Sequence, residues 1–204
     1  MRRAQSWRFR GLAGPGFSLI ELLLVVAILL LLVTLYWSPN SGSRQRALQV
    51  ACQRNLQKLS IGLQIYATDN GGRYPFLSNA VRSEQALGLL VPRYNSDNSL
   101  FICAGSKDPA PAAGRSLSDS RISYAYYMGR ASTSLGTVVM TDAQVNTESK
   151  SAGELVFSPD GKPPANNHEK AGGNLLFSDG HTQAFPPRAS LPLPVGAGER
   201  LLNP

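Results

Sequence analysis

The sequence predicts an α+β fold in which a long N-terminal helix, with a membrane half and an amphipathic half, packs against a small antiparallel sheet. Three observations lead to this prediction. An apolar run covers residues 17–37, a stripe of apolar residues with helical spacing covers 48–66, and an Asp-Gly turn at 179–180 separates two strand-like runs. The chain has 204 residues, and about 165 of them follow the apolar run, enough for one modest domain.

A basic leader precedes the apolar run. It contains no acidic residue before Gly16, and its arginines are Arg2, Arg3, Arg8 and Arg10. Residues 17–37 would span about 30 Å as a helix, which matches the hydrocarbon core of a bilayer. Positive charge stays on the cytoplasmic side during insertion. We therefore expect a single-pass membrane protein with its N-terminus inside and the rest of the chain outside.

Glu21 is the one carboxylate in the apolar run. A charged side chain costs roughly 2.5–3.5 kcal/mol at the centre of a bilayer on insertion scales, and less near the end of a span. In the first turn of a helix, a carboxylate also meets the positive end of the helix dipole. A residue with this cost is expected to have a function.

The N-terminal pattern resembles the signal of type IV pilins and type II secretion pseudopilins. It consists of the basic leader, Gly16, the residues Phe17-Ser18-Leu19-Ile20-Glu21 and a hydrophobic helix. The resemblance implies that a prepilin peptidase cuts between Gly16 and Phe17, methylates the new amine of Phe17 and leaves the helix on the mature chain. It also implies a pilin-like fold, with Glu21 as the fifth mature residue.

The function implied by this resemblance is that of a structural subunit of a type IV pilus-like filament or a secretion pseudopilus. The implied partners are the prepilin peptidase, other subunits and an assembly platform in the bacterial inner membrane. Glu21 would pair with an amine, either the N-terminal amine of its own chain or that of a neighbouring subunit. The pairing would form when a new subunit is docked correctly. The precursor would be held in the inner membrane with its head outside the cytoplasm.

Two other interpretations of the N-terminus remain open. An ordinary secretory signal also has a basic start and an apolar core, and Ser41-Gly42-Ser43 offers small residues for cleavage. The run is also compatible with an uncleaved anchor that places Glu21 near the interface. The net charge of +7 falls to +3 without the four leader arginines, so nucleic acid is not an expected partner of the head.

Residues 38–72 are expected to form an amphipathic stem helix that follows the membrane helix of 17–37. Its apolar face is formed by Leu48, Cys52, Leu56, Leu59, Leu63 and Tyr66. This spacing predicts one helix face that covers the core of the head, with a partner surface as the alternative. Asn70-Gly71-Gly72 is a stop signal. The Cys-x-x-Asn-Leu sequence in this helix also resembles a large set of bacterial pilin-like proteins.

Cys52 and Cys103 are the only cysteines. An outward-facing domain is in an oxidising place, so we expect a disulfide, worth about 4 kcal/mol in the chain-entropy model for this loop length. Two buried thiols are the alternative. Two cysteines at this spacing do not make a zinc site by themselves.

The head, residues 73–185, is expected to contain several short strands. The expected strands cover residues 100–103, 122–128, 137–141, 154–157, 173–178 and 181–185. The last two flank Asp179-Gly180, a strong signal for a two-residue hairpin turn. The aromatic residues of 124–127 suit a pleated surface, with a sugar-binding or partner-binding cluster as the alternative. Residues 186–204, rich in Pro and Gly, are expected to be a flexible extended tail, with a partner strand as the alternative.

The last hairpin resembles the His-then-Asp-Gly-His element found near the C-terminus of many prepilin-type proteins. Here His168 and Asp179 are separated by ten residues, whereas the usual spacing is nine. His168, Asp179 and His181, with Asp142 at the end of a nearby strand, are candidate ligands for a divalent cation or members of a hydrogen-bond network. No cofactor is otherwise expected.

Catalytic motifs are absent from the sequence, so the chain is not expected to be an enzyme. There is no Gly-x-Ser-x-Gly elbow, no phosphate-binding loop and no His-Glu-x-x-His helix. The alternative function is a membrane-tethered head that binds or hydrolyses an extracytoplasmic ligand such as a glycan. Such a head would use the corner formed by His168, Asp179 and His181.

Overall fold

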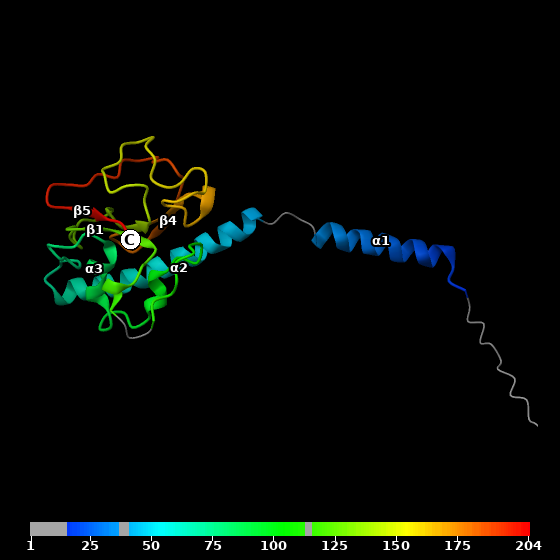
Figure 1. Cartoon of the computed structure of the whole chain (residues 1–204), viewed down its shortest axis with the longest axis horizontal. Coiled ribbons are helices and arrows are strands. Elements are labelled where there is room, and N and C mark those ends of the chain that lie inside the picture. The colour runs from blue at the N-terminus through cyan, green and yellow to red at the C-terminus, as the bar shows by residue number, and fades with distance from the viewer. Residues whose placement is uncertain (1–15, 37–40, 113–115) are drawn as a thin grey trace, which may run out of the picture. The chain divides into compact units, whose positions relative to one another are not determined.

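The computed structural model describes residues 16–36, 41–112 and 116–204 (Figure 1). The expected leader therefore lies outside the described residues, apart from Gly16. The chain divides into two compact units, Met1–Asn40 and Ser41–Pro204. Each unit is considered by itself below.

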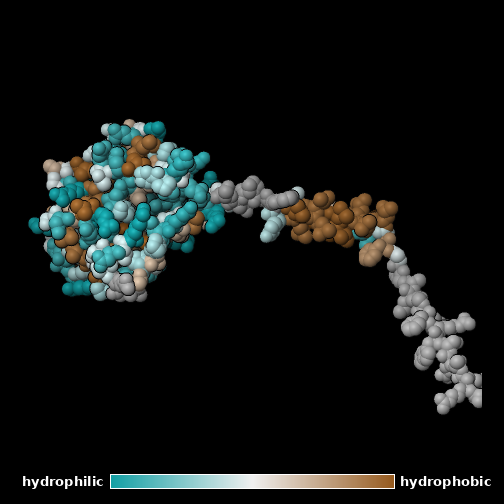
Figure 2. Space-filling model, viewed as in Figure 1, coloured by the Kyte–Doolittle hydropathy of each residue, from teal (hydrophilic) through white to brown (hydrophobic). Residues whose placement is uncertain are grey.

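The first unit contains helix α1, Leu19–Tyr36. Leucine, isoleucine and valine occupy every side of it, so it has no polar face. The side that is visible in Figure 2 is brown over most of its length. Its described side chains are exposed, including the large apolar residues from Leu19 to Val33. None of the helices in the described residues is long and apolar enough to cross a membrane.

The expected pilin-like fold, with one long helix running from the membrane segment into the stem, is wrong. The second helix, α2, covers Ser41–Asp69, and it belongs to a different compact unit from α1. The two helices are separate elements, and residues 37–40 between them lie outside the described part of the chain. The physical reason is available in the sequence: Pro39 has no amide hydrogen and disfavours helical backbone at the residue before it.

Helix α2 packs on the head through one face. Cys52, Leu56, Leu59 and Leu63 are buried in the core, whereas Leu48 and Tyr66 at the two ends of the stripe are half-buried. The stripe is therefore core, as the spacing predicts. After Asp69 the helix stops at two glycines with positive φ, and the amide of Gly72 donates to the carbonyl of Ala67 at 2.7 Å.

The head contains a five-stranded antiparallel sheet in the order β4-β3-β2-β1-β5. The strands are β1 Tyr124–Met128, β2 Val138–Asp142, β3 Gly173–Phe177, β4 Thr182–Phe185 and β5 Arg200–Leu202. A short helix, α3 Ser83–Leu87, precedes them. In the register of β2 and β3, Thr141 faces Leu175, which places Asp142 beside the start of β3.

Both faces of the sheet are covered, which explains why its strands do not alternate between buried and exposed residues. Tyr124, Tyr126 and Met128 pack on the α2 side, whereas Ala125 and Tyr127 pack in a second core on the other face. That second core is formed with residues such as Phe157 and with the C-terminal segment. A strand buried on both faces reads as a continuous apolar run, as β1 does.

Three local predictions in the head are wrong. Residues 98–101 form a 3-10 turn, where a strand was expected at 100–103, and Asp97 caps it by accepting the amide of Ser99. Residues 154–157 make only an isolated bridge between Leu155 and Arg188. The hairpin expected around Asp179-Gly180 is confirmed by the antiparallel pairing of β3 and β4, but its connection has four residues and not two, since β3 ends at Phe177 and β4 begins at Thr182.

The C-terminal segment 186–204 is not a flexible tail. Its strand β5 pairs with β1, and Leu193, Leu201 and Leu202 are buried. The guanidinium of Arg130 lies 4.0 Å from the ring centre of Tyr127, donates to the carbonyl of Pro194 and pairs with a carboxylate of this segment. A few buried leucines and one buried cation therefore order a segment whose composition suggests disorder.

Candidate functional site

The expected cleavage site lies immediately before α1. Gly16, Phe17 and Ser18 have no regular secondary structure and are exposed, and the side chain of Phe17 is 80% exposed. The helical hydrogen bonds begin at Ser18, whose carbonyl accepts the amides of Glu21 and Leu22 at 3.0 and 3.2 Å. The Gly16–Phe17 bond therefore lies in an accessible segment that ends where the helix starts.

Glu21 lies in the first turn of α1, where its carboxylate is near the positive end of the helix dipole. The side chain is exposed, and no described cation forms an ion pair with it. It is also the one charged side chain of an otherwise apolar helix.

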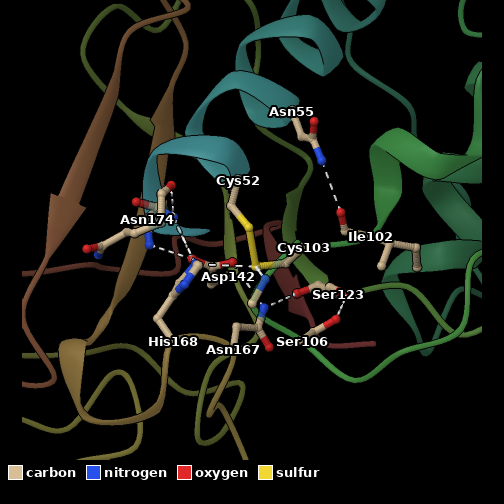
Figure 3. The surroundings of a disulfide bond; sticks show 12 residues. Cys52, Asn55, Ile102, Cys103, Ser106, Ser123, Asp142, Asn167, His168 and Asn174 are labelled. Carbon is tan, nitrogen blue, oxygen red and sulfur yellow. Dashed lines mark hydrogen bonds and ion pairs between the residues drawn. A yellow bond between two sulfur atoms is a disulfide. The ribbon is translucent and has the colours of Figure 1, made fainter. Parts of the chain in front are cut away.

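The second group of predicted site residues lies in the head, around a disulfide that joins Cys52 to Cys103 (Figure 3). The two Cα atoms are 5.1 Å apart, and both side chains are buried. One turn further along α2, Asn55 donates to the carbonyl of Ile102 at 3.0 Å. The disulfide and this hydrogen bond both tie α2 to the segment that precedes β1.

His168 lies against the disulfide and is fully buried. Its Nε2 atom is 3.3 Å from the Sγ atom of Cys103, 3.3 Å from Oδ2 of Asp142 and 3.2 Å from Nδ2 of Asn174. Its Nδ1 atom has no hydrogen-bond partner among the described residues. One imidazole nitrogen thus contacts a sulfur, a carboxylate and an amide. Figure 3 shows these groups, which come from the segment before β1, from β2 and from β3.

Asparagine side chains hold the buried carboxylate of Asp142. Oδ2 accepts the backbone amide of Asn174 at 2.7 Å and its side-chain amide at 3.0 Å, while Oδ1 accepts the side-chain amide of Asn167 at 3.0 Å. Asn174 also reaches the carbonyl of Gln49 in α2 at 3.3 Å. These donors satisfy a charge that burial would otherwise make costly.

Gly105 closes the other side of the His168 ring. A Cβ atom at this position would lie 2.3 Å from the carbonyl oxygen of Asn167 and 2.7 Å from Nδ1 of His168. These distances are far shorter than van der Waals contact, so the segment after Cys103 can pass the imidazole only with glycine here.

Asp179 and His181 belong to a different place, the turn between β3 and β4. Oδ1 of Asp179 accepts the backbone amide of His181 at 3.1 Å and lies 2.6 Å from its Nδ1, and these contacts from His181 lower the pKa of the Asp179 carboxyl. The His181 ring stacks on Phe177 at 4.1 Å, and its side chain is 52% exposed. Gln64 of α2 donates to the carbonyl of Ser178 at 2.7 Å, which docks this turn on the helix.

The structure therefore divides the four predicted metal ligands into two pairs. His168 and Asp142 are buried beside the first residues of β3, whereas Asp179 and His181 follow its last residue. In the described residues, the three-residue group with metal-ligand spacing is Cys52, Cys103 and His168. The corner of His168, Asp179 and His181 expected for a ligand-binding or hydrolytic head is thus not formed by these contacts.

Sequence reasoning did not identify Asn174, Asn167 or Gly105. One signal was available: Asn174 is a polar residue in the otherwise apolar run Gly-Asn-Leu-Leu-Phe, and a polar group in a buried strand needs a partner. Nothing in the sequence indicates that the partner is Asp142, because the pairing depends on the register of β2 and β3.

A cleft of about 770 Å³ lies next to this cluster. Gly105 and Asn167 contribute to its lining, together with residues 160–166, Glu169, Lys170 and Pro204, whereas His168 does not line it. Its charges are mixed, and one of its cations, Arg121, already pairs with Asp108 at 3.2 Å. The lining has four basic and three acidic side chains, an imbalance too small to select an anionic or a cationic ligand.

Comparison with known proteins finds no family model, no curated protein and no solved structure that matches this chain.

Proposed function

We propose that this chain is a structural subunit of a type IV pilus-like or type II secretion pseudopilus-like filament, and that a prepilin peptidase releases it from its leader. The observation that carries the proposal is α1: an exposed helix that is apolar on every side, has one carboxylate in its first turn and follows an exposed Gly16–Phe17 junction.

The physical argument begins with the exposed apolar surface. A helix that is hydrophobic all round is stable in a protein only when other apolar groups surround it. Soluble monomers rarely expose an apolar surface of this extent, and such surfaces mark interaction sites. Packing α1 among copies of itself supplies that environment and makes the helix the core of an assembly.

Glu21 gives the assembly its register. A carboxylate buried in a bundle of apolar helices is costly unless a cation pairs with it. Cleavage between Gly16 and Phe17 creates a primary amine four residues before Glu21, and each copy carries one. The amine of one copy can neutralise the Glu21 of another only at one axial offset, so the pair selects a single packing arrangement.

The location of the precursor is part of the same proposal. We assign it to the bacterial inner membrane, held by the apolar segment 17–37 with its head outside the cytoplasm. This assignment rests on the arginines of the leader and on the apolar sequence. The disulfide of the head agrees with an oxidising compartment. Its partners are the peptidase, an inner-membrane assembly platform and other subunits.

The direct test is to express the full chain in bacteria with and without a prepilin peptidase and to follow the size of the product. We expect cleavage only when the peptidase is present. Gly16→Leu should abolish cleavage because the bulky side chain blocks the bond, while Gly14→Ala, a change at a neighbouring leader glycine, should leave it intact. Cleavage of Gly16→Leu at the parent rate, or no peptidase-dependent product, would overturn the proposal.

A further inference from the structure

We propose that the reduced form of the head binds one zinc ion through Cys52, Cys103, His168 and Asp142. The disulfide form and the zinc form would be two alternative states of the same buried cluster. This inference does not depend on the proposed filament function, because it rests only on contacts inside the head.

The geometry of the cluster is close to that of a tetrahedral zinc site. The two sulfur atoms and one nitrogen of His168 all lie within 4.8 Å of one another. Nε2 is 3.3 Å from the sulfur of Cys103 and 3.3 Å from Oδ2 of Asp142. With Zn–N and Zn–O bonds of about 2.0–2.2 Å and Zn–S bonds of about 2.3 Å, the edges of a tetrahedron are about 3.3–3.8 Å.

Two edges of that tetrahedron therefore already have the required length. Two changes are needed: separation of the two sulfur atoms, which a covalent bond now holds together, and movement of the Asn174 side-chain amide, which now lies 3.2 Å from Nε2 of His168. Their Cα atoms lie on α2 and on the segment before β1, and neither side chain has to leave the core. We expect rotation about the side-chain bonds of the two cysteines to make room for the ion.

The donor set also has the right chemistry. Two thiolates, one imidazole and one carboxylate are ligands that zinc binds in proteins, and a fully protein-bound set of four is typical of structural sites. Asp142 keeps its hydrogen bonds from Asn174 and Asn167, so its carboxylate is oriented by outer groups as metal-ligating carboxylates usually are. All four side chains are buried, which keeps water out of the coordination shell.

The conversion between the disulfide and zinc states accounts for every electron, proton and bond. A dithiol reductant gives two electrons and two protons to the disulfide, which breaks the S–S bond and leaves two thiols, while the reductant becomes a disulfide. Zinc then displaces one proton from each thiol as two Zn–S bonds form. An oxidant of the disulfide class reverses the sequence and releases the ion.

In both states α2 remains fastened to the segment that contains Cys103. The zinc state adds His168 and Asp142 to the same junction, whereas the disulfide state does not use them as ligands. A reducing compartment favours the zinc form and an oxidising one favours the disulfide. The cluster would thus link α2 to the segment that contains Cys103 in both reducing and oxidising compartments.

The test uses the full chain, kept in solution with a mild detergent because α1 is exposed and apolar. The chain is prepared reduced or oxidised, mixed with zinc, passed through a desalting column and measured for bound metal. We expect one zinc per reduced chain and none per oxidised chain. Cobalt(II) in place of zinc should give the intense d–d and thiolate charge-transfer absorption of a tetrahedral site, which oxidation should abolish.

Variants identify the ligands. His168→Ala should lower zinc affinity by more than about 100-fold, because loss of outer-shell groups alone costs about 10–100-fold. His181→Ala, the change of the other histidine of the chain, is the matched control and should bind as the parent does. Circular dichroism of the reduced variants shows whether they are folded. If His168→Ala unfolds, the cobalt spectrum of the parent still decides the question.

Four results would overturn the proposal. Three concern the parent: a reduced chain that binds no zinc, a cobalt spectrum without thiolate charge transfer, and equal zinc binding by the reduced and oxidised chains. The fourth is a loss of zinc binding in His181→Ala that equals the loss in His168→Ala.

Discussion

Helices α1 and α2 are both rich in leucine, but they use their apolar residues in opposite ways. In α2, Leu56 is fully buried while Ile61 on the opposite face is 61% exposed, so the helix has an inside and an outside. In α1 every described side chain is exposed, and apolar residues occupy all sides. Figure 2 shows the contrast between the brown surface of α1 and the mixed surface of the head.

This difference separates folding from assembly. The apolar face of α2 is satisfied within its own unit, so it contributes to the stability of the head. The apolar surface of α1 has no such partner within its own helix, so it is available to other molecules. Substitutions in α2 should change the free energy of unfolding of the head, and substitutions in α1 should change association.

The largest effect is expected from Glu21→Gln. Removing the carboxylate leaves the partner amine unpaired in an apolar bundle, at a cost of about 3–5 kcal/mol, which is more than about 100-fold in an association constant. Filaments sheared from cells and quantified by immunoblotting should be lost, while cleavage of the leader continues. Glu21→Asp keeps the charge and should restore part of the yield. Normal filament yield from Glu21→Gln would contradict the assigned role.

The disulfide should have the next largest effect, and only on the head. Replacing Cys52 and Cys103 together by alanine should lower the free energy of unfolding by about 4 kcal/mol, because the cross-link closes a long loop and lowers the conformational entropy of the unfolded chain. Urea unfolding measures it. Adding a reductant should destabilise the parent and leave the double variant unchanged. An equal response of both proteins to the reductant would rule out this role.

Leu56→Ala tests the inner face of α2. Deleting a fully buried leucine side chain should cost about 3 kcal/mol, since transfer and cavity terms add. Ile61→Ala, on the exposed face of the same helix, is the control and should change the free energy of unfolding by less than about 0.5 kcal/mol. Similar losses for both variants would mean that α2 is not packed in this orientation.

A smaller effect is expected at Gly105. The added methyl of Gly105→Ala would overlap Asn167 and His168, so the segment has to shift, at a cost of about 1–3 kcal/mol. At Gly88 a Cβ atom would be no closer than 3.8 Å to its neighbours, so Gly88→Ala is the matched control and should be tolerated. Thermal unfolding of both variants compares them, and an unaffected Gly105→Ala would show that the His168 ring is placed elsewhere.

The smallest effect is a dependence on pH. Burial raises the pKa of the Glu84 carboxyl above its ordinary value of 4.5, although Arg82 pairs with it at 2.9 Å. A raised pKa in the folded state favours the protonated form, so this contribution to stability is present at acidic pH and is lost as pH rises through the folded pKa. Glu84→Gln should therefore weaken the loss of stability between acidic and neutral pH.

Urea unfolding across that pH range measures the Glu84 effect. Asp119→Asn, which neutralises an exposed carboxylate, is the control and should keep the parent profile. A steeper loss of stability in Glu84→Gln than in the parent would show that the sign is wrong.

Local patterns in the sequence predict local structure well. The stripe from Cys52 to Leu63 identifies the buried face of α2, because helix periodicity depends only on neighbouring residues. The strands expected at 122–128 and 137–141 are confirmed as β1 Tyr124–Met128 and β2 Val138–Asp142, with bounds that differ by one or two residues. The strand expected at 100–103 fails because a short apolar run cannot be distinguished from a turn, and the Asp97 cap decides.

Contacts between distant segments could not be predicted. The order of β5 beside β1 is set by burial of Leu201 and Leu202, which a Pro-rich and Gly-rich composition conceals. At the candidate site, His168 and Asp142 were named from the sequence, but their junction with the cysteines required the fold.

The most direct measurement of the central claim is the mass of the native chain, recovered from the membrane fraction and from sheared filaments. We predict one species that begins at Phe17, carries one methyl group on its N-terminal amine and retains all of α1. A native chain that begins at Met1, or one cut near Ser43 with the apolar helix removed, would contradict the account.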